Sequence, residues 1–303
     1  MKIKFTEIKR QDKRVFLITG ANSGLGYETS KFLLKKGGTV IMCCRDLKKG
    51  ERAKKELSKL NFPGNIELVE LDLSDLIKVR NFANSIKNKF NYLDVLINNA
   101  GIMAPPKTFS EQGFEIQFAV NHLAHMLLTL ELLPMLKEKK NSRVVTVTSG
   151  VQYFGRIQWD DLQGKLKYDR WASYAQSKLA NVMFGLELNL KLKENNSKTS
   201  SLLAHPGFAR TNLQRNSVKA NQSWSEELAY KIMDPMFQSA KMGALPQIAA
   251  ATLPNAKGGE QYGPRFNFRG YPKICKNATK ALNQNSRKRL WETSENLIKN
   301  FLK

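Results

Sequence analysis

Residues Val15–Gly26 read Val-Phe-Leu-Ile-Thr-Gly-Ala-Asn-Ser-Gly-Leu-Gly, a short β-rich run that ends in a glycine-rich turn. A helical pattern follows directly over Tyr27–Lys36. A phosphate-binding turn needs this order, because its glycines let the backbone approach a pyrophosphate and the following helix offers free N–H groups. The spacing Gly20-x-x-x-Gly24-x-Gly26 differs from the general Gly-x-Gly-x-x-Gly pattern, so the turn alone is weak evidence for nucleotide binding.

The alternation of strand and helix continues along the chain. Further strands are predicted at Thr39–Cys44, Ile66–Leu71, Leu93–Ile97, Arg143–Thr148 and Ser201–Ala204. Helices are predicted at Leu47–Leu60, Glu111–Lys137 and Ser173–Leu192. A further helix is predicted after Ser74, which is expected to cap it, and its apolar face comprises Val79, Phe82, Ala83, Ile86 and Phe90. This order predicts an α/β fold, a single Rossmann-type, doubly wound parallel sheet with helices on both faces. Ligands of such sheets bind beyond the carboxyl ends of the strands.

The regular alternation of strands and helices ends after Gly207. Residues Thr211–Pro254 are predicted to be mostly helical, followed by a short strand at Glu260–Gly263 and a terminal helix at Ser286–Phe301. Without a Pro/Gly/Ser-rich linker, we expect one domain. Its parts are a cofactor-binding and catalytic core (13–210), a small helical substrate lobe (211–255) and a C-terminal strand and helix (256–303).

Tyr174 and Lys178 are four residues apart within Trp171–Asn181. On a helix both side chains leave the same face, one turn apart. A nearby positive charge favours the phenolate, so the pair is a candidate general acid/base. The spacing alone is weak evidence, since Tyr-x-x-x-Lys also occurs as a solvated pair.

Polar or glycine-rich groups follow most of the predicted strands. They are Asp72-Leu73, Asn98-Asn99-Ala100-Gly101, Ser149 and Pro206-Gly207-x-x-x-Thr211. Together with the glycine turn, Asn121 and Tyr174-x-x-x-Lys178, this set resembles the short-chain dehydrogenase/reductase family over about residues 13–263.

The resemblance implies a catalytic set of Asn121, Ser149, Tyr174 and Lys178. Tyr174 exchanges a proton with the substrate oxygen, and Ser149 hydrogen-bonds the substrate carbonyl. Lys178 lowers the pKa of Tyr174 and holds the nicotinamide ribose, while Asn121 holds a water that relays protons from Lys178 to solvent.

The resemblance also implies a set of cofactor-binding residues at the strand ends. They are Gly20, Asn22, Ser23, Gly24, Leu25, Gly26, Arg45, Asp72, Leu73, Asn98, Ala100, Gly101, Tyr174, Lys178, Pro206, Gly207 and Thr211. In this set Asp72 meets the adenine, Asn98 supports the cofactor and the sheet, and Thr211 reaches the nicotinamide or pyrophosphate.

The end of the second strand predicts which cofactor binds. Cys44 stands where an acidic residue would bind a ribose 2′-OH, and Arg45 follows it. Because a guanidinium suits a 2′-phosphate, we predict NADP(H) over NAD(H). Asp46 is expected to cap the next helix.

Within the family, Cys44-Arg45-Asp46, Val120–His125 and Ser177–Asn181 are similar to the retinol-dehydrogenase-like and WW-domain-oxidoreductase-like group. A more distant likeness is to light-dependent protochlorophyllide reductase, which has a cysteine where Ala180 stands. We expect an NADP(H)-dependent oxidoreductase that interconverts a hydrophobic, retinal-like carbonyl and its alcohol. The alternatives are a pigment reductase and a non-catalytic NADP(H)-sensing protein.

Aromatic residues are expected on the substrate side of the site. Tyr153, Phe154 and Trp159 follow the serine strand, and Trp and Met residues occur in 211–254. Such side chains suit a bulky apolar substrate. The alternative is that they pack in the core or in a homo-oligomer interface.

Composition limits the other function classes. The net charge of +23 comes from lysines spread along the chain, without a zinc-finger, RNP or basic-zipper pattern, so no specific nucleic acid is expected. Weak contact with an anionic membrane surface is left open. The cysteines and histidines show no metal-ligand spacing, so no metal is expected. Met1–Arg14 has no apolar run and no transmembrane segment is predicted, which favours a cytoplasmic protein.

Overall fold

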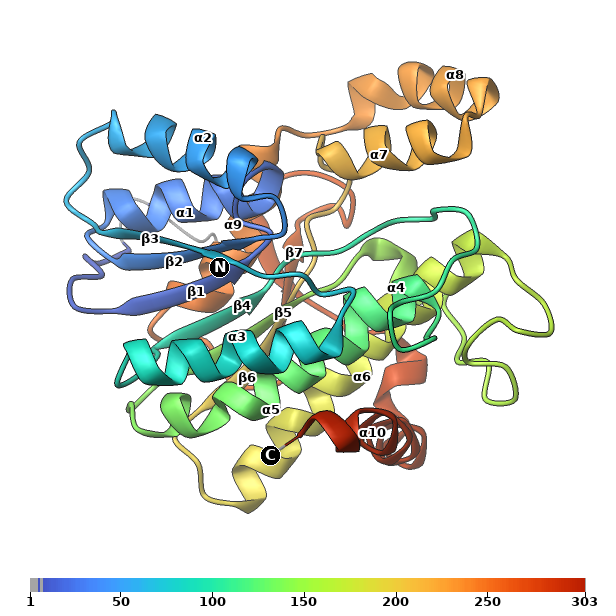
Figure 1. Cartoon of the computed structure of the whole chain (residues 1–303). Coiled ribbons are helices and arrows are strands. Elements are labelled where there is room, and N and C mark those ends of the chain that lie inside the picture. Colours follow the sequence, from blue (N-terminus) through green and yellow to red (C-terminus); the bar gives the residue numbers. More distant parts are fainter. Residues whose placement is uncertain (1–4, 6–7, 303) are drawn as a thin grey trace.

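The computed structural model describes residue 5 and residues 8–302 of the chain. The expectation that Met1–Arg14 carries no signal sequence therefore falls partly outside the described residues. The described strands form one eight-stranded sheet, in the order β3-β2-β1-β4-β5-β6-β7-β8. Helices cover both faces of this sheet (Figure 1), which confirms the predicted Rossmann-type α/β fold.

The strands β1 to β7 run parallel, and β8 is antiparallel to β7. Their bounds are β1 Val15–Thr19, β2 Thr39–Cys44, β3 Ile66–Glu70, β4 Val95–Asn98, β5 Arg143–Val147, β6 Ser200–Ala204, β7 Gln261–Pro264 and β8 Pro272–Cys275. The strand β8 was not predicted, because Pro272–Cys275 is a short edge strand that begins with proline and has two exposed positions.

The α-helices lie mainly between these strands in the sequence. They are α1 Gly24–Lys35, α2 Leu47–Ser58, α3 Leu76–Lys89, α4 Ile116–Phe118, α5 Ala124–Lys137, α6 Arg170–Glu194, α7 Asn212–Asn221, α8 Trp224–Met233, α9 Ala240–Thr252 and α10 Gln284–Ile298. Among the described residues, the helical stretch Ile116–Lys137 is long and apolar enough to span a membrane. However, 83% of its most apolar 18-residue segment is buried inside the protein.

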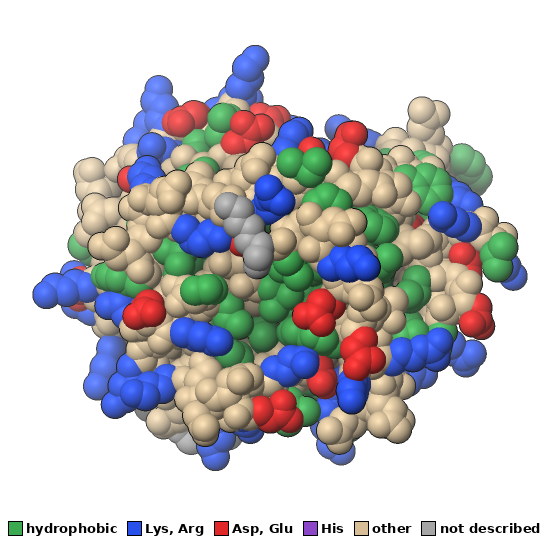
Figure 2. Space-filling model, turned by 60° about the horizontal axis from the view of Figure 1, so that its bottom comes forward, with side chains coloured by type: hydrophobic (Ala, Val, Ile, Leu, Met, Phe, Trp, Pro, Cys, Tyr) green, Lys and Arg blue, Asp and Glu red, His purple; other side chains and the backbone are tan. Residues whose placement is uncertain are grey.

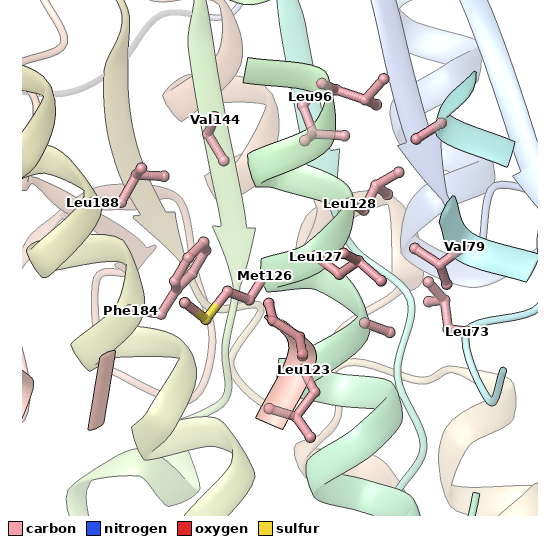
Figure 3. Close-up of a cluster of buried hydrophobic side chains, with 14 of the residues drawn as sticks. Leu73, Val79, Leu96, Leu123, Met126, Leu127, Leu128, Val144, Phe184 and Leu188 are labelled. Carbon is pink, nitrogen blue, oxygen red and sulfur yellow. The ribbon is translucent and has the colours of Figure 1, made fainter. Parts of the chain in front are cut away.

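Both faces of the sheet are buried, so its strands read as continuous apolar runs. On β1, Leu17 joins a cluster that α3, α5 and α6 cover. Its neighbours Phe16 and Ile18 point to the opposite face and join a second cluster beneath α1, α2 and α9. Figure 3 shows part of the first cluster, in which Phe184 of α6 and Leu128 of α5 lie beside the sheet.

The N-termini of α2 and α3 can be compared with the predicted caps, Asp46 and Ser74. Asp46 caps α2 as predicted, because its carboxylate accepts a hydrogen bond from the Lys49 N–H at 3.0 Å. The predicted Ser74 cap is wrong. Asp75 caps α3 instead, while the Ser74 hydroxyl donates to Asp72 at 2.7 Å.

The segment after Gly207 divides differently from the prediction. The helices α7 and α8 stand beyond the carboxyl ends of the strands, at the top of Figure 1. In contrast, α9 lies in the layer beside α1, where Ala249 and Ala251 are fully buried against the sheet. The lobe is therefore shorter than 211–255, and its role as a substrate lobe stays a prediction.

Candidate active site

The glycine turn between β1 and α1 has the backbone geometry of an anion-binding loop. Gly20 and Gly24 adopt φ of 65° and 55°, a left-handed region that favours glycine. A Cβ on Gly26 would lie 2.3 Å from the Gly20 carbonyl oxygen, so a side chain there would clash with the turn. The N-terminus of α1 has no side-chain cap and no acidic residue in its first turn. Its free N–H groups can therefore bind phosphate oxygens.

Asn99 follows β4 and stabilises this turn through hydrogen bonds. Its amide nitrogen donates to the carbonyl oxygens of Thr19 at 2.7 Å and Gly20 at 3.4 Å. In return, the Thr19 hydroxyl oxygen accepts the N–H groups of Asn99 and Ala100, both at 2.9 Å. Asn99 belongs to the predicted motif after β4 but was not among the predicted site residues.

Tyr174 and Lys178 lie one turn apart on the buried side of α6. The helix begins behind Asp169, whose carboxylate accepts the Ala172 N–H at 2.7 Å. Tyr174 is 5% exposed and Lys178 is 4% exposed, and the Lys178 Nζ lies 5.7 Å from the centre of the Tyr174 ring. Both residues and Ser149 line a cavity of about 400 Å³ that reaches the glycine turn. The fold therefore brings the predicted pair and the predicted serine together.

Burial controls the protonation of this pair. It raises the pKa of Tyr174 to about 12, against the opposing effect of a hydrogen bond with Ser149. Burial also lowers the pKa of Lys178 to about 8. Desolvation of the phenolate is the largest cause of this shift, and the lowering of the Tyr174 pKa by Lys178 stays a prediction. At neutral pH Tyr174 is a phenol that can donate a proton.

Asn121 lies in a π-helical turn, Ala119–Leu123, that interrupts the long helix predicted over Glu111–Lys137. Its amide oxygen accepts the Ile102 N–H at 2.8 Å, and its amide nitrogen donates to Ile102 and to Ser177. The side chain is fully buried and ties the loop after β4 to α6. Single π turns often occur at functional sites. The water-holding role of Asn121 stays a prediction.

His125 connects this π turn to the glycine turn. Because the Thr19 hydroxyl oxygen already accepts two N–H groups, its hydrogen points to the His125 Nε2 at 3.0 Å. The ring hydrogen is thereby assigned to Nδ1, which donates to the Asn121 carbonyl oxygen at 3.1 Å. Burial lowers the pKa of His125 to about 4, so the ring is neutral at physiological pH. This histidine was not among the predicted site residues.

Arg45 and Asp72 follow β2 and β3 at the same edge of the sheet. Partial burial raises the pKa of Asp72, but hydrogen bonds from Ser74 and the charges of Arg45 and Lys78 bring it below its usual value. The Arg45 side chain is exposed to solvent. Neither Arg45 nor Asp72 lines the cavity around Tyr174, so they are placed beside it at the strand ends.

Three further predicted cofactor residues also lie outside the cavity lining. Asn98 is fully buried and donates to the Thr129 hydroxyl at 2.9 Å, so it supports the packing of β4 on α5. Leu73 is part of the apolar core. Gly26 lies beneath the turn, against the Gly20 carbonyl. The buried Asn98 side chain thus supports the sheet, as predicted, and its support of the cofactor stays a prediction.

The remaining predicted cofactor residues line the cavity. They are Gly20, Asn22, Ser23, Gly24, Leu25, Ala100, Gly101, Tyr174, Lys178, Pro206, Gly207 and Thr211. Thr211 also caps α7 by accepting the Leu213 N–H at 3.3 Å.

The outer part of the cavity is lined by apolar residues, of which Met233 belongs to the segment 211–254 that was expected on the substrate side. They include Met103, Val151, Trp171, Phe208, Leu213, Tyr230, Met233 and Phe237. Tyr153, Phe154 and Trp159 do not line it. The Tyr153 hydroxyl donates to the Lys276 carbonyl, Phe154 is 83% exposed, and Trp159 lies beneath the Arg289 guanidinium. Phe208, Tyr230 and Phe237 were not predicted at the site, because only the tertiary fold brings α8 and its flanking loops near Tyr174.

These residues fit a nicotinamide dinucleotide. The glycine turn offers N–H groups for a pyrophosphate, and the cavity leads from there to Tyr174. A Cβ on Gly101 would lie 3.0 Å from the Asn121 Oδ1 and 3.2 Å from the Lys178 Nζ, so the glycine leaves room for both groups at this point. Among the residues that the structure describes, no group of three or more His, Cys, Asp or Glu could hold a metal ion.

Comparison with known proteins agrees with this geometry. The sequence model of the short chain dehydrogenase family matches residues 14–222. Retinol dehydrogenase 11 of Homo sapiens is 41% identical over 211 residues, which are 70% of this chain and 66% of that protein. Retinol dehydrogenase 12 of Mus musculus is 35% identical over 94% of this chain and 86% of that protein.

Solved structures share the fold. An uncharacterized protein from Mycobacterium paratuberculosis has a TM-score of 0.81 and 38% identity, covering 99% of this chain and 98% of that one. Pseudomonas aeruginosa RhlG, solved with NADP, has a TM-score of 0.66 at 21% identity over 84% of this chain and 95% of that one, which shows a common fold alone. From its motifs, its fold and these matches, the chain belongs to the short-chain dehydrogenase family of oxidoreductases.

Proposed function

We propose that this protein is an NADP(H)-dependent oxidoreductase that interconverts a hydrophobic, retinal-like carbonyl compound and its alcohol. The observation that carries the proposal is one continuous cavity. It runs from the glycine turn past Ser149, Tyr174 and Lys178 to the apolar side chains of Phe208 and Phe237. Such a cavity suits a dinucleotide at one end and a bulky apolar substrate at the other. The similarity to retinol dehydrogenases supports a retinoid-like substrate.

The chain's own residues supply the proton chemistry. When bound, a nicotinamide cofactor supplies or accepts the hydride. In the reductive direction Ser149 hydrogen-bonds the carbonyl oxygen, and the Tyr174 phenol donates its proton to that oxygen. The Lys178 ammonium holds the cofactor ribose and stabilises the phenolate that remains. In the oxidative direction Tyr174 must first lose its proton, which its raised pKa disfavours at neutral pH.

The end of β2 supports NADP(H). Cys44 is buried, and its thiol donates to the Asp46 carbonyl oxygen at 3.3 Å. The Asp46 carboxylate is engaged by the N–H and ammonium of Lys49. Arg45 is the exposed group at this strand end, and its guanidinium suits a 2′-phosphate.

A carbonyl-substrate screen tests the proposal. We expect retinal and other apolar aldehydes or ketones to consume NADPH, as followed by its absorbance. Tyr174→Phe should lower kcat by at least about a hundredfold, the range for loss of a general acid, while NADPH binding stays within about twofold. Full activity of Tyr174→Phe would refute the mechanism. NADPH binding without turnover of any carbonyl compound would favour a sensing protein instead.

A further inference from the structure

The loop between β7 and β8 presents apolar side chains to solvent. Phe266 is 60% exposed, Tyr271 is 51% exposed and Ile274 is 56% exposed, and Phe268 is 39% exposed. Exposed aromatic side chains gathered in so short a stretch mark an interaction surface more often than an accident of packing.

Basic residues alternate with these apolar ones. Arg265, Arg269 and Lys273 are all exposed, and residues 265–280 contain no Asp or Glu. The Arg265 guanidinium lies 5.6 Å from the centre of the Phe266 ring. We call this surface the hairpin strip, and it comprises Arg265, Phe266, Phe268, Arg269, Tyr271, Lys273 and Ile274.

The hairpin strip is fixed to the rest of the site. The Gly270 N–H donates to the Gln238 side chain at 3.0 Å, and the Phe268 carbonyl oxygen accepts the Phe208 N–H at 2.7 Å. The loop therefore has a defined position relative to the segment between α8 and α9.

The strip is also continuous with the apolar end of the cavity. The Phe208 ring lies 6.4 Å from the Phe268 ring and 5.8 Å from the Phe237 ring. Phe208 and Phe237 both line the cavity. In Figure 1 the loop after β7 rises to the same end of the molecule as α7 and α8.

We propose that the hairpin strip docks on an anionic lipid bilayer. Aromatic rings favour the interfacial depth of a bilayer, and each neighbouring cation gains free energy from anionic headgroups. The absence of acidic residues in 265–280 matches the negative surface of a cytoplasmic leaflet. Resting on the proposed function, this docking sets the apolar end of the cavity against the phase in which a retinal-like substrate dissolves.

Sedimentation with vesicles tests the docking without cofactor or substrate. The full chain should bind vesicles of phosphatidylcholine and phosphatidylserine and should bind pure phosphatidylcholine weakly. Phe266→Ser with Ile274→Ser should weaken binding at least about tenfold. Arg265→Gln, Arg269→Gln and Lys273→Gln together should weaken it about a hundredfold, since each cation near the surface contributes about fivefold.

Matched controls separate the strip from general charge and apolarity. Ile77→Ser on α3 removes an apolar side chain that is 53% exposed elsewhere. Arg52→Gln, Lys55→Gln and Lys59→Gln remove three exposed charges from α2 and its end. These controls should keep binding to within about threefold, and all variants should keep the NADPH affinity of the parent chain.

Three outcomes would overturn the docking. The first is no binding of the parent chain to phosphatidylserine vesicles. The second is an equal loss in the control variants, which would assign binding to net charge alone. The third is a dimer in light scattering that Phe266→Ser dissociates, without vesicle binding, which would assign the strip to a second copy of this chain. Vesicle binding by a chain inactive on every carbonyl compound would keep the docking and refute the proposed function.

Discussion

At the scale of single residues, the site depends on burying groups that prefer water. Lys178 is an ammonium donor enclosed among α6, the Gly101 loop and the cavity wall. Its pKa falls to about 8 because burial disfavours the charged form. The spacing of Tyr174 and Lys178 was readable in the sequence, but the direction of both pKa shifts depends on burial, which only the folded chain supplies.

Lys178→Met should abolish turnover and raise the melting temperature. The folded pKa of about 8 lies below the ordinary value of 10.5, so the unfolded chain binds more protons between these pH values. The lysine therefore costs up to about 3 kcal/mol below pH 8, and this cost disappears as the pH rises toward 10.5. Calorimetry of the apoprotein should show Lys178→Met melting several degrees higher at pH 7, with a gap that narrows by pH 10. If the difference in melting temperature were the same at pH 7 and pH 10, burial would not lower the pKa of Lys178.

Arg45→Asp should reverse the choice of cofactor. Loss of the guanidinium removes charge-assisted hydrogen bonds to a 2′-phosphate, and a carboxylate there can accept hydrogen bonds from a ribose 2′-OH. We expect NADPH to bind about ten- to a hundredfold more weakly and NADH to bind more tightly, as measured by titration of fluorescence. Arg52→Asp on α2 is the charge-matched control. If Arg45→Asp keeps its preference for NADPH, another residue recognises the phosphate.

At the scale of elements, the π turn Ala119–Leu123 organises the site. It places Asn121 against Ile102 and Ser177 while His125 reaches Thr19. Three chain segments distant in sequence are joined at this turn. An apolar helical pattern does not reveal such a turn, because a π turn inserts one residue without changing which residue types are buried.

His125→Gln should impair catalysis through positioning. Glutamine cannot span both the Thr19 hydroxyl and the Asn121 carbonyl as the ring does, so the glycine turn and the π turn lose their connection. We expect a fall in kcat of about tenfold or more and weaker NADPH binding. His122→Gln is a matched control in the same helix, because His122 contacts Ser294 of α10 and not the cavity. That variant should lose stability and keep its kinetic constants. An equal fall in kcat in both variants would show that His125 contributes only through packing.

At the scale of the whole molecule, two apolar cores enclose one sheet, and the site lies beyond the strand ends. On the face drawn in Figure 2, Lys and Arg side chains lie dispersed among acidic and polar ones. Such dispersion is typical of a solvated surface.

The whole molecule should be stabilised more by NADPH than by NADH. A ligand that binds only the folded chain at a hundred times its Kd adds about 2.7 kcal/mol, because it shifts the folding equilibrium by mass action. For a chain of this size we expect the melting temperature to rise by several degrees with NADPH. Differential scanning fluorimetry with equal concentrations of both cofactors measures the difference. A larger shift with NADH would refute the assignment of NADP(H).

The sequence alone determined the fold class, the strand ends and the order of the site motifs. The apolar runs of parallel strands, the glycine turn and the helical spacing of Tyr174 and Lys178 are local patterns, and local patterns follow from backbone sterics and burial. The tertiary structure decided the rest. It assigned Asn98 to the core, brought Phe208 and Phe237 to the cavity and made burial set the pKa of Tyr174. These properties depend on contacts between segments far apart in the chain, which no short stretch of sequence contains.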